Sequence, residues 1–355
     1  MTTINPKAPV LVTGASGYIA SWLVKYLLEA GYTVHGTVRD PAKKAGMEHL
    51  QALADKHGDR LKLFKADLLA HGSYDAAMRG CELVMHTASP FVIQGIKDAQ
   101  EELVRPAVEG TRNVLESANR TPSVKRVVLT SSVASIYGDA VDGRKVPNGI
   151  FTEEQWNTTS SVSHQPYSYS KVAAEREAWE IQRKQSRWDL VTINPGLVLG
   201  PSLTRASAST SLVFIKQLSN GTMFPAAPDM WMGVVDVRDV ALAHVKAGFA
   251  PQARGRHIVN AANATLLEMG RTLRARFGRK YLFPRFKAPK LLIWLIGPYA
   301  GGLTRKFVRN NVGHRFGFDN SKSRKELGME YRLLEHTLAD HFNQLLDDGL
   351  IRRRS

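Results

Sequence analysis

The chain has 355 residues, which is more than one compact core needs and favours a large domain with a smaller one beside it. Hydrophobic residues make up 43% and charged residues 23%, a balance that excludes a disordered chain, and the single cysteine, Cys81, excludes a disulfide framework and a cysteine-based zinc site. The formal net charge is +16, with 21 Lys and Arg against 8 Asp and Glu in residues 251–355, an excess that fits a solvated surface, nucleic acid, an anionic membrane or an anionic small molecule.

The first 200 residues alternate between strand and helix patterns. The N-terminus lacks the charged and then apolar arrangement of a secretion signal, so we expect a cytoplasmic protein. Apolar runs predict strands at 10–12, 33–38, 61–64, 83–86, 127–129 and 190–193. Helical patterns lie between them at 18–30, 103–119 and 169–185. The alternation predicts a doubly wound α/β Rossmann fold, a parallel sheet with helices on both faces, over residues 1–195.

Beyond Pro195 the pattern changes, because Pro, Gly and Ser cluster in the chain. We expect residues 196–355 to form a smaller mixed subdomain that binds substrate. Within it, residues 231–260 are predicted to return to the Rossmann sheet as strand, helix and strand.

The apolar run Leu291 to Ile296 is too short for a transmembrane segment, because a span needs roughly 20 apolar residues. Two hypotheses remain for it: a helix that lines an apolar substrate pocket, and weak peripheral membrane contact through 287–309, where lysines and arginines flank the run. The first is preferred, with Phe91, Leu203, Phe214, Phe224 and 281–303 as candidate pocket walls.

A glycine-rich turn follows the first strand and opens the first helix. Gly14 and Gly17 allow a sharp turn and a close backbone approach to a pyrophosphate. The start of the helix directs its free amides and the positive end of its dipole at that anion. The spacing is G-x-x-G-x-x-A, so the position within a strand–turn–helix unit, more than the glycines alone, predicts a dinucleotide site.

The end of the second strand distinguishes the two nicotinamide cofactors. An acid there binds the ribose 2′-hydroxyl of NAD, whereas an arginine accommodates the 2′-phosphate of NADP. Arg39 takes this position, with Lys43 and Lys44 behind it, and favours NADP. Asp40 leaves NAD open as the alternative.

Tyr167 and Lys171 lie four residues apart, so one helical face brings them together. A nearby ammonium favours ionised tyrosine, which makes the phenol a usable proton donor and acceptor. Ser131 and Ser132 follow the fifth strand, at the carboxyl edge where open parallel sheets bind ligands.

With these features in view, the chain resembles the extended short-chain dehydrogenases/reductases, and within them the group of dihydroflavonol, cinnamoyl-CoA and aldehyde or carbonyl reductases. The resemblance covers roughly residues 8–345. It is carried by TGASGYIA at 13–20, TVRDP at 37–41, ADL at 66–68, HTASP at 86–90, VEGTRNVLE at 108–116, VLTSS at 128–132, YSYSK at 167–171, NPGLVLGP at 194–201, VVDVRDVALAH at 234–244 and DNSKSRKELG at 319–328.

The resemblance implies roles for individual residues. Tyr167 would donate the proton to the carbonyl oxygen, Lys171 would bind the nicotinamide ribose and lower the tyrosine pKa, and Ser132 would polarise the carbonyl. These three are the expected catalytic residues. The expected cofactor-binding residues are Gly14, Ser16, Gly17, Tyr18, Ile19, Arg39, Lys44, Asp67, Leu68, Thr87, Ala88, Ser89, Ser131, Tyr167, Lys171, Pro195, Gly196, Leu197 and Val198.

One position departs from many short-chain dehydrogenases, which supply an asparagine for a proton relay. The matching residue is Pro106, as in the reductase group, and Asn113 further along is expected to be structural. His86 and His164 are interpreted first as packed, hydrogen-bonded histidines and second as parts of the site. No histidine spacing predicts a metal.

The sequence therefore predicts an NADPH-dependent reductase of an apolar aldehyde or ketone, aromatic compounds included. One alternative is a nucleotide-sugar epimerase/dehydratase or a hydroxysteroid dehydrogenase of the same superfamily. Another is a non-catalytic NADP-sensing or nucleic-acid-binding module, although no nucleic-acid-binding motif supports it.

Overall fold

A computed structural model describes the whole chain except residues 44, 90–95, 205–209, 301–302 and 353–355. Its main feature is a seven-stranded sheet in the order β11-β7-β5-β4-β1-β2-β3, and every pair in it is parallel. The strands are β1 (Val10–Thr13), β2 (Val34–Val38), β3 (Leu61–Lys65), β4 (Leu83–His86), β5 (Arg126–Thr130), β7 (Asp189–Pro195) and β11 (Gly255–Val259). The predicted doubly wound α/β fold is confirmed.

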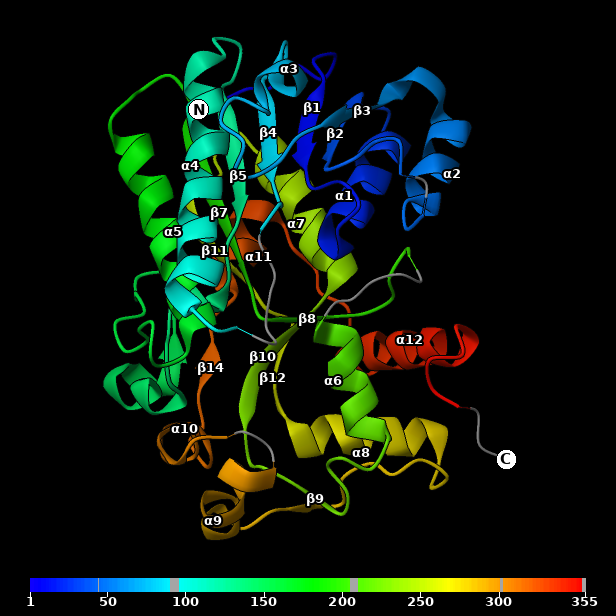
Figure 1. Ribbon diagram of the computed structural model, residues 1–355, viewed down its shortest axis with the longest axis vertical. Helices are drawn as coiled ribbons and strands as arrows, with labels where there is room; N and C mark the ends of the chain where they lie inside the picture. Colours follow the sequence, from blue (N-terminus) through cyan, green and yellow to red (C-terminus); the bar gives the residue numbers. More distant parts are fainter. Residues whose placement is uncertain (44, 90–95, 205–209, 301–302, 353–355) are drawn as a thin grey trace.

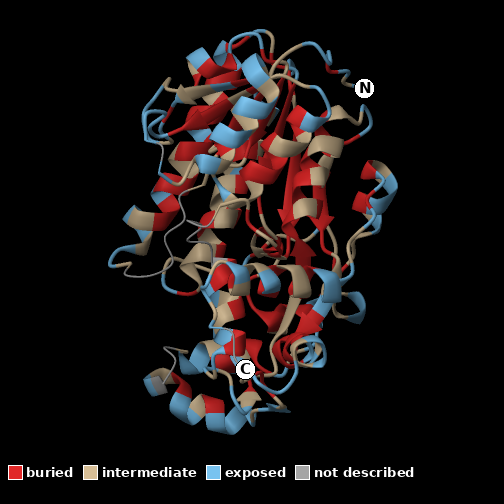
Figure 2. Ribbon diagram, turned by 90° about the vertical axis from the view of Figure 1, so that its right-hand side faces the viewer, coloured by how far each residue is buried: buried red, intermediate tan, exposed pale blue. Residues whose placement is uncertain are grey.

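Helices cover both faces of this sheet (Figure 1). On one face, α1 (Tyr18–Glu29), α2 (Glu48–His57) and α7 (Val237–Phe249) share a buried apolar core with the strands. On the other, α3 (Asp75–Met78), α4 (Arg105–Arg120) and α5 (Pro166–Arg183) form a second core. Figure 2 shows the buried residues gathered in the sheet and the exposed ones on the outer sides of the helices.

The smaller lobe lies beyond the carboxyl ends of the strands (Figure 1). It contains a three-stranded sheet of β8 (Leu197–Leu199), β10 (Trp231–Asp236) and β12 (Ala262–Thr265). Two short parallel pairs join β6 (Ile150–Phe151) to β14 (Gly317–Phe318) and β9 (Ala226–Ala227) to β13 (Phe286–Lys287). Its helices include α6 (Thr210–Ser219), α8 (Leu266–Phe277), α9 (Lys290–Ala300), α10 (Arg305–Asn311) and α12 (Leu334–Asp347), whereas α11 (Ser321–Leu327) packs against α7 and against β11 of the large sheet.

The expected return of 231–260 to the large sheet is partly wrong. The helix α7 and the strand β11 do return, but β10 pairs with β8 and β12 in the smaller sheet. The chain leaves the large sheet after β7 and continues as β8, the strand with which β10 pairs. Gly196 between β7 and β8 lies so close to β10 that a Cβ would stand 2.5 Å from the carbonyl oxygen of Gly233. A strand pattern in the sequence does not specify which sheet supplies the partner strand.

Among the residues that the structure describes, no helix combines the length and the apolar character that crossing a membrane requires.

Candidate active site

The turn between β1 and α1 has the shape that a pyrophosphate site requires. Gly14 has φ +66°, and a Cβ there would stand 3.1 Å from the Cα of Ala88. Gly17 is the N-cap of α1, which has neither a side-chain cap nor an acidic residue in its first turn. The first amides of α1 therefore keep their hydrogen-bonding capacity for an anion. These residues fit a dinucleotide cofactor.

Two other residues of this turn also pack against the fold. The Tyr18 hydroxyl donates to the Gly200 carbonyl at 2.5 Å, so it ties α1 to the segment after β8. Ile19 packs against the core under the turn, whereas Ser16 is partly exposed.

The segment after β4 is held against this turn by hydrogen bonds. The Thr13 hydroxyl accepts from the amides of Thr87 (3.1 Å) and Ala88 (3.0 Å) and contacts Nδ1 of His86 at 2.9 Å. Burial, with a smaller contribution from the Lys171 charge, lowers the pKa of His86 to about 3. His86 is therefore a neutral packed residue, in agreement with the first interpretation of it.

At the end of β2, Arg39 is exposed and Asp40 is engaged locally. The Asp40 carboxylate accepts from the Ala42 amide at 3.0 Å within a turn. This arrangement leaves Arg39 as the charged group at the strand end and favours a 2′-phosphate there. Lys44 lies outside the described residues.

The loop after β3, which carries Asp67 and Leu68, is fixed by Asn113 of α4. The Asn113 amide nitrogen donates to the carbonyls of Leu68 (3.1 Å) and Ala70 (2.8 Å), and its oxygen accepts from Gly72 (3.1 Å). Asp67 itself accepts from the Leu69 amide at 2.8 Å. Asn113 is therefore structural, as expected.

The start of α5 places Tyr167 and Lys171. Gln165, the residue before the helix, has φ 55° and donates from Nε2 to the Gly138 carbonyl (2.5 Å) and to Asp139 (2.6 Å). Tyr167 stands in the first turn and Lys171 one turn later, where its ammonium donates to the Ser89 hydroxyl at 3.0 Å. The Lys171 nitrogen lies 5.7 Å from the centre of the Tyr167 ring. The predicted pair shares one helical face.

Burial dominates the protonation of both groups. It raises the pKa of Tyr167 to about 12 and lowers the pKa of Lys171 to about 8. Desolvation of the phenolate is the cause of the raised tyrosine pKa, which is opposite in direction to the lowering expected from the ammonium. A phenol in this state is protonated at neutral pH and able to donate.

The two serines after β5 have different partners. The Ser132 oxygen accepts from the Ala134 amide at 3.1 Å and caps the 3₁₀ turn Val133–Ser135. The Ser131 hydroxyl donates instead to the buried carboxylate of Glu175. In these hydrogen bonds the Ser132 hydroxyl is an acceptor, so its hydrogen can be donated to a further acceptor. The Ser131 hydroxyl donates its hydrogen to Glu175 and stabilises the fold.

Sequence reasoning missed the ion pair that supports these serines. The Glu175 carboxylate accepts from Nε of Arg256 at 2.6 Å, from Ser135 at 2.5 Å and from Asn194 at 2.8 Å. Both charged side chains are buried, and the Arg256 guanidinium lies 4.0 Å from the centre of the Trp156 ring. Two features of the sequence could have indicated this ion pair: Glu175 follows Lys171 by four residues, and Arg256 lies inside a strand pattern.

A void of about 20 Å³, little larger than one water molecule, lies among several predicted cofactor residues beside α5. Its lining includes Ala88, Ser89, Ser131 and Lys171, together with Leu68. Residues from the ends of β3, β4 and β5 thus converge with α5 at the carboxyl edge of the sheet.

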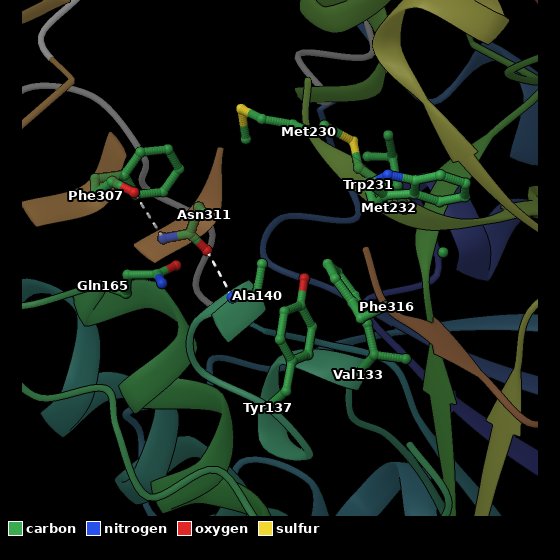
Figure 3. Close-up of a pocket in the computed structure, with 12 residues that line it drawn as sticks. Val133, Tyr137, Ala140, Gln165, Met230, Trp231, Met232, Phe307, Asn311 and Phe316 are labelled. Atoms are coloured by element: carbon green, nitrogen blue, oxygen red, sulfur yellow. Dashed lines mark hydrogen bonds between the residues drawn. The ribbon is translucent and has the colours of Figure 1, made fainter. Parts of the chain in front are cut away.

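A second cavity of about 220 Å³ lies on the other side, between the sheet edge and the smaller lobe. Half of its lining residues have aromatic or thioether side chains, and Figure 3 shows the Tyr137 hydroxyl pointing to its middle. The lining consists of Val133, Tyr137, Ala140, Gln165, Leu197, Met230, Trp231, Met232, Gly233, Phe307, Asn311 and Phe316. Val133 follows Ser132, and Gln165 precedes Tyr167 by two residues, so the cavity adjoins both catalytic candidates.

The candidate pocket walls named from the sequence do not line this cavity. Leu203, Phe214, Phe224 and the described part of 281–303 are all absent from its lining, and Phe91 lies outside the described residues. Of the predicted loop Pro195–Val198, Leu197 reaches it. Pro195 ends β7, Gly196 crosses β10, and Val198 pairs with Val235.

Asp139 organises the floor of this cavity. Burial acts to raise its pKa, but hydrogen bonds from His164, Asn311 and Asn310 outweigh that effect, so the pKa is lowered. Nε2 of His164 contacts the carboxylate at 2.8 Å and Nδ2 of Asn311 donates to it at 2.7 Å. His164 is thus a packed partner of Asp139 and does not line the cavity.

Comparison with known proteins gives consistent relatives. Residues 10–262 match the family model described as the NAD dependent epimerase/dehydratase family. A cinnamoyl-CoA reductase of Medicago truncatula is 44% identical over 82% of this chain and 85% of its own length. Tetraketide alpha-pyrone reductase 1 of Arabidopsis thaliana is 37% identical over 97% of both chains. Among solved structures, the yeast methylglyoxal/isovaleraldehyde reductase Gre2 in complex with NADPH is 27% identical and superposes with a TM-score of 0.74 over 97% of this chain and 100% of its own.

Proposed function

The chain belongs to the NAD dependent epimerase/dehydratase family, and from that premise we propose that it is an NADPH-dependent reductase of an apolar, aromatic aldehyde or ketone. Several of its relatives are reductases by name, and one of them is a structure in complex with NADPH. The observation that carries the proposal is the position of Tyr167. It stands on α5 between Gln165, which lines the aromatic cavity, and Lys171, which lines the cavity of the cofactor candidates.

In this proposal the side chains around the substrate carbonyl do acid and hydrogen-bond chemistry. Tyr167 donates a proton to the carbonyl oxygen; burial raises the pKa of its phenol to about 12, so the phenol holds that proton at neutral pH. Ser132 donates a hydrogen bond to the same oxygen and stabilises the negative charge that develops on it. When bound, the cofactor supplies the hydride that reaches the carbonyl carbon.

Other residues hold this arrangement. Lys171 is fixed by Ser89 and binds the ribose next to the nicotinamide. Arg39 binds the 2′-phosphate, and the turn at Gly14 and Gly17 binds the pyrophosphate. Residues 1–195 thus bind the cofactor, while the segment after Pro195 supplies much of the substrate wall.

The substrate class follows from the cavity. Tyr137, Trp231 and Phe316 offer ring faces, and Met230 and Met232 offer adaptable apolar surface. The amide of Asn311 already donates to Asp139, and Figure 3 shows its hydrogen bond to the Phe307 carbonyl. Such a lining favours a flat apolar carbonyl compound over a sugar diphosphate, which needs unpaired cations or amides.

The test is a Tyr167→Phe variant assayed with a panel of aromatic and aliphatic aldehydes and ketones, with NADPH and NADH in parallel. Loss of a positioned acid lowers turnover by about 10²- to 10⁴-fold, while NADPH binding, followed by cofactor fluorescence, remains. Tyr32→Phe is the matched control, because Tyr32 stacks on Phe249 far from both cavities. Unchanged turnover of Tyr167→Phe would refute the role of the phenol, and binding of a UDP-sugar without reductase activity would favour an epimerase.

A further inference from the structure

The smaller lobe carries an uninterrupted basic stretch. Between Glu268 and Asp319 the chain contains 12 Lys and Arg and no Asp or Glu. This stretch includes most of α8, all of α9 and α10, and the strand β13. Figure 1 shows these elements at the end of the molecule opposite β1 to β3. No acid within this stretch offsets its cations, which gives α9 and α10 a positive local potential.

Helix α9 is apolar on both of its faces. Its inner side packs Ile293 against Val308 and Val312, the latter two being buried residues of the α10 segment. Its outer side presents Leu291, Leu295 and Tyr299, spaced four apart, with exposures of 68%, 48% and 85%. A helix that is apolar all round is normally buried on all sides.

The exposed stripe is wider than one row of side chains. Leu292 and Ile296 add a second row on α9, and Phe286 of β13 is also exposed. Large aliphatic side chains gathered in this way mark an interaction surface. We call these six residues the α9 patch: Phe286, Leu291, Leu292, Leu295, Ile296 and Tyr299.

Cations surround the α9 patch. Lys306 and Arg309 on α10 are exposed, and Arg305 lies over the Trp294 ring at 4.7 Å from its centre. Lys287 pairs with Asp229 at 3.0 Å, a single acid that comes from outside the basic stretch. The combination of exposed Leu, Ile, Phe and Tyr with a cationic border is typical of helices that lie in a bilayer interface.

We propose that the α9 patch docks this protein on the surface of an anionic phospholipid bilayer. The apolar side chains would enter the boundary between headgroups and acyl chains, and the surrounding cations would contact anionic headgroups. The docking uses no residue of the glycine turn or of the start of α5, so it does not depend on the proposed reaction.

Charge and chemistry disfavour two other partners for the α9 patch, a second copy of this chain and a nucleic acid. A twofold contact between copies of this chain would place the same basic border against itself, and like charges repel. Nucleic acid would use the cations but not a stripe of aliphatic side chains, since its contacts are mainly to phosphates and base edges. An anionic bilayer complements both features.

The test is flotation of the full chain with phosphatidylcholine vesicles that contain or lack phosphatidylglycerol, at low and high salt. The apolar variant is Leu291→Gln with Leu295→Gln, and its control is Leu333→Gln, an exposed leucine before α12. The charge variant is Lys306→Gln with Arg309→Gln, and its control is Lys56→Gln with Lys184→Gln on α2 and at the end of α5. Circular dichroism and the melting temperature confirm that each variant folds.

We expect the wild-type chain to float only with the anionic vesicles and to be released by high salt. The apolar variant should bind at least tenfold more weakly, and the charge variant about fivefold more weakly for each cation removed, while both controls bind like the wild type. Failure of the wild type to bind would overturn the proposal. Equal losses of binding in the control variants would also overturn it. So would a dimer of the wild-type chain that dissociates in the apolar variant, or tight binding of a DNA or RNA duplex without any vesicle binding.

Discussion

Replacement of Glu175 by glutamine tests the buried ion pair behind the serines. The Oε2 oxygen accepts from Ser131, Ser135 and Asn194, while Oε1 accepts from Nε of Arg256. A glutamine has one oxygen for these two sets of donors. In either orientation its NH₂ group faces a donor, and Arg256 becomes a buried charge without its counter-charge.

The cost follows from the burial. Breaking a buried ion pair by removing one partner costs about 3–5 kcal/mol, because the remaining charge is desolvated and unpaired. For a chain of 355 residues, the usual unfolding entropy per residue converts this to a fall of about 4–7 °C in the melting temperature. Ser132 should shift as well, since its carbonyl accepts from Ser135 at 2.7 Å and from Asn194 at 3.3 Å. We expect turnover to fall on the order of tenfold or more.

The assay is urea and thermal unfolding together with steady-state NADPH oxidation. Glu177→Gln is the control, because it makes the same chemical change on the same helix but breaks a partly exposed bridge to Arg112. That bridge contributes about 1 kcal/mol or less. If Glu175→Gln destabilised the protein no more than Glu177→Gln does, the ion pair would not support the site and our reasoning would be wrong.

Three further predictions concern cofactor selection, pH and the glycine turn. Arg39→Ala should raise the KM for NADPH about 10- to 100-fold, from the loss of a charged hydrogen bond, and leave the KM for NADH nearly unchanged; equal effects on both would contradict the assignment. Burial lowers the pKa values of His244 and His341 to about 4, so between about pH 6.5 and 4 only the unfolded chain takes up these protons. Each histidine should therefore lower the free energy of unfolding by up to about 1.4 kcal/mol per pH unit as the pH falls below 6.5. We expect a lower urea midpoint at pH 5 than at pH 7, and a higher midpoint at pH 5 would contradict this prediction. Gly14→Ala should weaken NADPH binding in a fluorescence titration, because its φ is +66° and its Cβ would stand 3.1 Å from Ala88; unaltered affinity would show that the turn is not the pyrophosphate site.

Local patterns in the sequence were sufficient to predict most strands of the large sheet. The strands β1 to β5 and β7 were predicted because each is a short run rich in apolar residues. The glycine turn and the spacing of Tyr167 and Lys171 were also visible, since both depend on residues close together in the chain. Both features are determined by the local conformation of a short segment of the chain.

Contacts between distant residues were decided only by the tertiary structure. The partner of β10, the pairing of Glu175 with Arg256 and the walls of the aromatic cavity all join segments that lie far apart in the sequence. The protonation of Tyr167 belongs to the same class, because the pKa depends on how much water the completed fold excludes from the phenol. Burial and long-range pairing are properties of the assembled chain, and no single stretch of it contains them.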